Sequence, residues 1–268
     1  MNPSACRSVV VVCSTVVLAL ASGCARGSGQ PPVSDSADAH YAAAPPAPPA
    51  RPVYRVIDVP HGGSVTGTIT LAHDVATDTV VQMFADQDVC GEHRRIHLVD
   101  RRGDKVANVV VWLADVHAGK ALPIDRRYDI SSEECDLDPR VQAVIAGGTL
   151  NVFNSDRAVH RTRFLRAGTD SVIALVHETD AGQVVPVRSV LAEPGLVEVR
   201  CDMHPYTRGW IRVFDHPYFD VTDRRGRFTL DAVPPGTYHL VAWQPRLGTI
   251  ERTVTVQAGE ATKIDLAF

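Results

Sequence analysis

The side chains best suited to chemistry in this chain are those of Cys201 and His204, which are separated by two residues. The residues before Cys201 alternate between apolar and charged side chains, which predicts a strand whose apolar face points into a core, with the thiol at its end. A second imidazole, that of His160, follows a predicted strand that ends at Asn154. Because thiolates and imidazoles bind transition metals, this pattern indicates a candidate metal site.

Short segments that alternate between apolar and polar residues recur after residue 52 and predict β-strands. The continuous apolar run at residues 109–113 predicts a strand that is covered on both faces. Further predicted strands lie at residues 65–71, 141–145, 149–153, 171–176, 185–190, 196–201, 210–214, 227–230, 237–243, 252–257 and 261–268. Since no window has convincing helical periodicity, we expect all-β sandwiches whose strand ends and loops position the thiol and the imidazoles.

The loop from Cys201 to His204 and the strands beside it resemble the ligand region of cupredoxins, in the short-loop form of amicyanin. The resemblance implies that His160, Cys201 and His204 are three equatorial ligands, a trigonal set that suits both oxidation states of copper. In that family an axial methionine stands three residues after the second histidine, and Thr207 takes that position here. The resemblance therefore implies copper as the cofactor and electron transfer or copper holding as the function.

Other interpretations fit the same residues. Zinc can be bound by one cysteine, two histidines and a water molecule. A metal-free tethered β-sandwich that acts as a binding or scaffold protein needs no ligands, and Arg161 and Arg163 beside His160 disfavour a bound cation. Met203 inside the loop and the carbonyl group of Val159 offer only weak axial contacts. Copper-dependent colour distinguishes the copper site from the metal-free scaffold.

The C-terminal part, from about residue 217, resembles the carboxypeptidase regulatory-like, or transthyretin-like, β-sandwich, which is a structural or binding module. Its first strands look like the residues around Gly67 and at 109–112, far upstream. The expected fold class is therefore a cupredoxin-like Greek-key β-sandwich inserted in or next to a transthyretin-like β-sandwich. The predicted domains are N-terminal strands of the regulatory-like sandwich at 53–129, a cupredoxin-like domain at 130–215 and the regulatory-like sandwich at 216–268.

The N-terminal residues resemble a bacterial lipoprotein signal. Arg7 precedes a short apolar run, and Ala-Ser-Gly-Cys follows at residues 21–24. The resemblance implies a signal peptide at 1–23, lipidation of Cys24 and a Pro/Ala-rich tether at 24–52. We expect an exported protein that is anchored through lipid to the bacterial membrane, in the periplasm or at the cell surface; a plain signal peptide is the alternative.

Three cysteines remain beyond the predicted tether, namely Cys90, Cys135 and Cys201. In an oxidising compartment they allow one disulfide and one leftover thiol. If Cys201 is a ligand, as the cupredoxin resemblance implies, the disulfide joins Cys90 to Cys135. If it is not, Cys201 can pair with either of the other two.

Composition and motifs narrow the function further. The net charge of −4 does not favour a nucleic-acid partner. Motifs of serine hydrolases, zinc peptidases and phosphate-binding loops are absent from the sequence, so we expect neither an enzyme nor a small-molecule substrate, and we expect a redox partner protein. The remaining histidines beyond the predicted tether are expected at the surface or in loops: His61, His73, His93, His97, His117, His177, His216 and His239.

Overall fold

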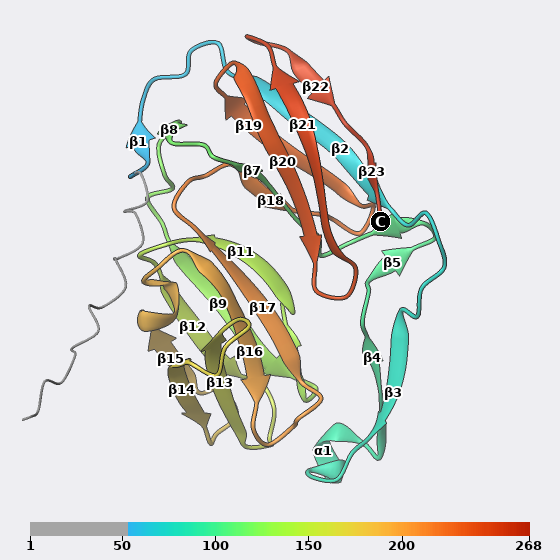
Figure 1. The fold of residues 1–268 in the computed structure, drawn as a ribbon. Helices are drawn as coiled ribbons and strands as arrows, with labels where there is room; N and C mark the ends of the chain where they lie inside the picture. Colours follow the sequence, from blue (N-terminus) through green and yellow to red (C-terminus); the bar gives the residue numbers. More distant parts are fainter. Residues whose placement is uncertain (1–52) are drawn as a thin grey trace, which may run out of the picture. The chain divides into compact units, whose positions relative to one another are not determined.

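The computed structural model describes residues 53–268. The predicted signal peptide, the predicted lipidation site Cys24 and the predicted tether lie outside these residues. Strands dominate the described part of the chain, so the expected all-β fold is confirmed (Figure 1). Its helical segments are one turn of α-helix, α1 (Gln87–Cys90), which the sequence did not predict, and a 3₁₀ turn, η1 (Ser189–Leu191). No helix in this part is long and apolar enough to cross a membrane.

The first sandwich combines strands from both ends of the described chain (Figure 1). One sheet has the order β19 (Arg227–Val233), β2 (Gly63–Thr70), β6 (Lys105–Val106) and β5 (Arg101–Arg102), with β22 (Ala261–Lys263) and β23 (Leu266–Ala267) also paired to β2. The other has the order β18 (Phe219–Val221), β7 (Val110–Ala114), β20 (Gly236–Gln244) and β21 (Gly248–Val256). In the register of the first sheet, Gly67 lies opposite Phe228. If one sandwich is inserted in the other, a nested arrangement, strands β2 and β7 must pair with strands of the C-terminal part, and these pairings are present.

Strand β7 explains why residues 109–113 form a continuous apolar run. Val111 and Leu113 belong to the core of the first sandwich. Val110 and Trp112, on the opposite face, pack in a separate cluster with Phe214 of the second sandwich. Each face of β7 is thus covered by a different layer of protein, and every position of the run needs an apolar side chain.

The second sandwich is built from the strands β9 to β17, which lie between β7 and β18 in the chain. One sheet has the order β10 (Asp136–Asp138), β9 (Arg127–Glu133), β12 (Thr149–Asn154) and β15 (Val184–Val187). The other has the order β11 (Val141–Ile145), β17 (Arg208–Phe214), β16 (Gly195–Cys201), β13 (His160–Arg166) and β14 (Val172–Glu178). Alternate residues of these strands fill the core between the sheets, for example Val152, Phe164 and Val199. This sandwich holds the candidate metal ligands.

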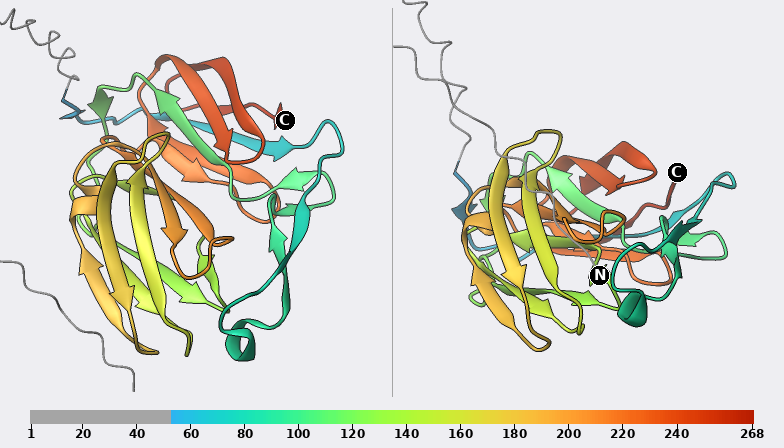
Figure 2. Two further views of the ribbon diagram at one scale, coloured as in Figure 1. Left: turned by 60° about the horizontal axis from the view of Figure 1, so that its bottom comes forward. Right: turned by 90° about the horizontal axis from the view of Figure 1, so that it is seen from below.

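A hairpin of β3 (Asp78–Gln82) and β4 (His93–His97), with α1 at its tip, stands apart from both sandwiches. Figures 1 and 2 show it in teal, running from the first sandwich toward one end of the second. A disulfide between Cys90 in α1 and Cys135, in the turn between β9 and β10, joins its tip to the second sandwich. A further short pair of parallel strands joins β1 (Arg55–Val56), near the start of the described residues, to β8 (Ala118–Gly119).

His216 lies in a loop, as expected of the remaining histidines, but it is buried there. Its side chain is buried in the connection from β17 to β18, where the chain returns to the first sandwich. The backbone N–H of Tyr218 donates to its Nδ1 at 3.2 Å, and its ring packs against Phe214 with the centroids 5.3 Å apart. The other seven histidines are exposed.

The burial of His216 predicts a pH-dependent stability. Burial lowers the pKa of His216 from 6.5 to about 4, so the folded protein favours the neutral imidazole. The contribution of His216 is fully present above pH 6.5 and is lost as the pH falls toward 4, by about 3 kcal/mol in total. Urea unfolding between pH 7 and pH 4 should show a smaller loss of stability for His216→Gln than for wild type. Equal pH profiles for the two proteins would contradict the assignment.

Candidate metal centre

Two neighbouring strands bring His160 and Cys201 together. Strands β13 and β16 are antiparallel neighbours in one sheet, and Thr162 of β13 lies opposite Cys201 of β16. His160 begins β13 and Cys201 ends β16, so both residues lie at the same end of the sheet. Because side chains alternate along a strand, His160, Thr162 and Cys201 all face the interior.

The loop after β16 adds His204 to this pair. The Sγ atom of Cys201 lies 3.7 Å from Nδ1 of His160 and 3.6 Å from Nδ1 of His204. The candidate ligand atoms of the three residues all lie within 4.8 Å of one another. The exposed fractions are 1% for each histidine and 3% for Cys201. The structure therefore brings together the three residues that the sequence singled out, in a buried cluster.

A carboxylate oxygen lies within hydrogen-bond distance of the Nε2 atom of each of the two imidazoles. Nε2 of His160 lies 3.0 Å from Oδ2 of Asp156, and Nε2 of His204 lies 3.1 Å from Oδ2 of Asp86. A proton on Nε2 that is donated to the carboxylate leaves a lone pair on Nδ1, the nitrogen that faces Cys201. Metal-binding histidines in proteins are oriented in this way.

Sequence reasoning missed both carboxylates. Asp156 lies four residues before His160, and this short spacing in the sequence could have indicated that the two side chains lie close together. The side chain of Asn154 fixes that loop, since its Nδ2 donates to the carbonyl of Ala158 at 3.0 Å and its Oδ1 accepts the N–H of Asp156 at 2.9 Å. Asp86 is 118 residues from His204, and no sequence pattern links them.

Burial favours the uncharged forms of His160 and Cys201. It lowers the pKa of His160, and the neighbouring His204 lowers it further. It also raises the pKa of the Cys201 thiol. Neutral imidazoles are ready to bind a metal, whereas the thiol must release its proton when the metal binds.

Thr207 is buried close to the cluster and forms a structural hydrogen bond. Its hydroxyl donates to the carbonyl oxygen of Cys135 at 2.9 Å, and its N–H donates to the carbonyl of His204 at 2.9 Å. Met203 is 40% exposed. Thr207 therefore ties the ligand loop to the turn that carries Cys135.

The remaining cysteines and the two arginines also have partners. Cys90 and Cys135 form a disulfide with their Cα atoms 5.6 Å apart, and Cys201 is free and buried. Arg161 and Arg163 both bind the carboxylate of Asp202, at 2.9 and 2.5 Å. Asp202 thus compensates the positive charges that stand beside His160.

Glu178 is a further polar group on the interior face, which the sequence did not single out. It lies opposite His160 in the pairing of β13 with β14, and its side chain is fully buried. The hydroxyl of Thr162 donates to its Oε2 at 3.1 Å, whereas Oε1 has no hydrogen-bond partner. Burial raises the pKa of Glu178 to about 7.

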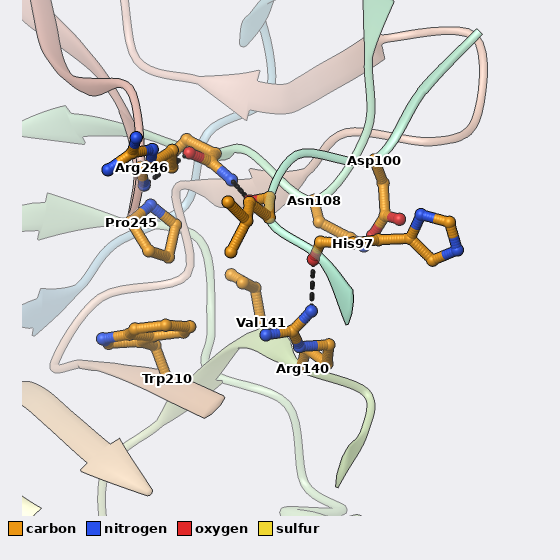
Figure 3. A pocket seen from close by; sticks show the side chains of 10 residues that line it. His97, Asp100, Asn108, Arg140, Val141, Trp210, Pro245 and Arg246 are labelled. Carbon is orange, nitrogen blue, oxygen red and sulfur yellow. Dashed lines mark hydrogen bonds between the residues drawn. The ribbon is translucent and has the colours of Figure 1, made fainter. Parts of the chain in front are cut away.

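A separate pocket lies where the two sandwiches and the base of the hairpin meet (Figure 3). Its lining includes Trp210, Pro245 and Arg140, and the Arg140 guanidinium donates to the carbonyl of His97. The volume of about 110 Å³ is smaller than that of typical ligand pockets, which begin at about 300 Å³. The pocket is therefore small for a ligand, and its lining does not include the His–Cys cluster. We take the cluster as the candidate site.

Comparisons with known proteins found similar solved structures and one match to a family model. No curated protein matches the chain. Among solved structures, the chain is similar to a purple cupredoxin from Nitrosopumilus maritimus, with 20% identity over 32% of this chain and 99% of that one and a TM-score of 0.27. It is also similar to amicyanin from Paracoccus versutus (21% identity, 35% of this chain and 85% of that one, TM-score 0.28).

The match with a third solved structure covers a smaller share of that protein. A copper-containing nitrite reductase from Thermus scotoductus is 20% identical over 39% of this chain and 25% of that one, with a TM-score of 0.30. At the level of families, residues 213–268 match the model of the carboxypeptidase regulatory-like domain, which confirms the resemblance of the C-terminal part.

Proposed function

We propose that this protein binds one copper ion through Nδ1 of His160, Sγ of Cys201 and Nδ1 of His204, and that it transfers electrons or holds copper. The observation that supports the proposal best is a free, buried thiol within 3.7 Å of two Nδ1 atoms. The opposite nitrogen of each imidazole is bound by a carboxylate, so both rings already present the correct face. Copper would supply one-electron chemistry, and the chain would hold it in a buried, fixed environment.

Burial supports copper over zinc. A zinc site with three protein ligands takes water as its fourth ligand and therefore needs access to water. Here His160, Cys201 and His204 have exposed fractions of 3% or less. One thiolate and two imidazoles form the trigonal set found at copper sites of electron-transfer proteins.

A metal titration of the purified protein tests the proposal. Cu²⁺ should bind with a stoichiometry of one and should produce an intense visible absorption from sulfur-to-copper charge transfer. Zn²⁺ is the control, because its filled d shell gives no such band. Uptake of zinc without copper would favour a zinc site. A protein that binds neither ion would be a metal-free scaffold.

We further propose that the chain is exported and anchored through a lipid on Cys24, with residues 24–52 as a tether. The proposal rests on the sequence of residues 21–24 after the short apolar run. Mass spectrometry of the protein from its native membrane should find an acylated N-terminal peptide that begins at Cys24. An unmodified N-terminus at another residue would contradict this.

A further inference from the structure

His204 is nearly inaccessible although it lies in a loop between two strands. Its exposed fraction is 1%. The atoms beside its Nε2 belong to the tip of the distant hairpin: Oδ2 of Asp86 at 3.1 Å and Sγ of Cys90 at 3.7 Å. The hairpin therefore contributes both the partner of this imidazole and part of its cover.

The tip is attached to the second sandwich at several points. The disulfide joins Cys90 to Cys135, and Met83 packs in a small apolar cluster with both cysteines. Tyr206, which lies in the same loop as His204, packs against this cluster. The position of the tip is therefore linked directly to the ligand loop.

Beyond these contacts, an ion pair of Arg94 with Glu134 at 3.6 Å and a hydrogen bond from Arg140 to the carbonyl of His97 join the hairpin to the second sandwich. The two strands of the hairpin have five residues each, and an isolated two-stranded hairpin is marginally stable in water. Val80 and Phe84 are exposed, so these apolar side chains contribute no burial. The Cys90–Cys135 disulfide is the covalent link between the hairpin tip and the sandwich.

We propose that this hairpin is a cap that controls metal exchange at the site, with the Cys90–Cys135 disulfide as its latch and Asp86 as a positioning residue for His204. The inference rests on the proposed function, since it concerns the regulation of the same site. While the disulfide is intact, the tip covers the Nε2 edge of His204 and holds the ring with Nδ1 toward Cys201. Opening of the cap frees this edge and lets the metal leave or enter.

The latch opens by a two-electron reduction. A dithiol reductant supplies two electrons and two protons, the bond between the sulfur atoms of Cys90 and Cys135 breaks, and two thiols form while the reductant becomes a disulfide. Cys201 takes no part in this exchange, because it is a free thiol and has no disulfide bond to be reduced. The redox state of the latch would therefore set the rate of metal exchange without changing the three ligands.

The first test needs no metal. Diethyl pyrocarbonate acylates accessible imidazole nitrogens, and peptide mapping locates the modification. In the metal-free protein with its disulfide, His204 should react at least about ten times more slowly than in Cys90→Ser/Cys135→Ser, because the cap covers Nε2. Exposed His239 should react equally in both proteins. Equal rates for His204 in both would overturn the cap.

A second form of the protein covers the case in which the double serine variant fails to fold. Wild type that has been reduced by a dithiol, and then freed of the reagent without oxygen, should show the same increase in labelling of His204. If His204 stays protected after Cys90 and Cys135 are reduced, the disulfide is not the latch.

The second test measures the exchange itself and the role of Asp86. Excess EDTA should remove Cu²⁺ at least about ten times faster from Cys90→Ser/Cys135→Ser than from wild type. Asp86→Asn should also accelerate removal and should shift the visible spectrum, because the hydrogen bond at Nε2 tunes the ligand. Asp88→Asn is the matched control, since it makes the same charge change at an exposed position of the same helical turn.

The outcomes separate the two proposals. Wild type that binds no copper would contradict the proposed function, and the labelling of His204 would still decide whether the cap exists. Copper that leaves wild type and the double serine variant at equal rates would contradict control by the latch. An Asp86→Asn protein with the spectrum and release rate of Asp88→Asn would remove Asp86 from the positioning role.

Discussion

Cys201→Ser should abolish the visible absorption of the copper-loaded protein and weaken copper binding at least about a hundredfold. The band requires charge transfer from a thiolate to copper, and the hard hydroxyl of serine cannot replace the soft sulfur as a ligand. The Sγ atom lies 3.7 and 3.6 Å from the two Nδ1 atoms, so its removal leaves His160 and His204 without the ligand between them. Absorption spectra and copper titrations of the two proteins measure both effects.

Thr207→Val is the control for this experiment. Valine has the shape of threonine without the hydroxyl, so the variant loses the hydrogen bond to the Cys135 carbonyl and leaves the three candidate ligands in place. We expect the absorption band to persist in Thr207→Val. If the band survives in Cys201→Ser, or disappears in Thr207→Val, the assignment of Cys201 as the thiolate ligand is wrong.

The three clustered residues could be predicted because short segments of the sequence resemble the ligand pattern of cupredoxins. Cys201 and His204 lie in one short loop, and alternation along the strand indicates the side to which Cys201 points. His160 was identified through the cupredoxin resemblance, in which a strand-end asparagine segment, here at Asn154, leads to the first histidine ligand. Asp86 could not be predicted, because its contact with His204 depends on how a hairpin 118 residues away docks.

In the fold, too, features that depend on a short segment could be predicted, and features that depend on distant contacts could not. The run at residues 109–113 predicted a strand with two covered faces, and β7 indeed packs in two separate clusters. The short helix α1 was missed because four residues are too few to show a helical period. The burial of His216 was missed because it depends on where the chain crosses between the sandwiches, and residue type gives no signal for this.

Gly67→Ala should destabilise the first sandwich by about 3 kcal/mol or more, at the upper end of the cost of overpacking a core. A Cβ atom at this position would overlap the carbonyl oxygen of Ile264 and would lie 2.8 Å from two ring atoms of Phe228. The backbone of Ile264 cannot move away easily, because its N–H donates to the carbonyl of Thr66 and the strands on either side of it pair with β2. The residues that would clash come from the C-terminal strands, so the experiment also tests the nested packing of the sandwich.

Thr68→Ala is the control for this change, because Thr68 is the next residue of β2 and points to the opposite, half-buried face. Its loss should cost less than about 1 kcal/mol, the full span of strand propensities. Urea unfolding of the full chain, followed by tryptophan fluorescence, gives both values, and Trp112 of β7 and Trp243 of β20 report on the first sandwich. A Gly67→Ala protein as stable as Thr68→Ala would show that β2 does not lie in close contact with the C-terminal strands. The nested arrangement would then have to be abandoned, because it requires a glycine where residues 67, 228 and 264 meet.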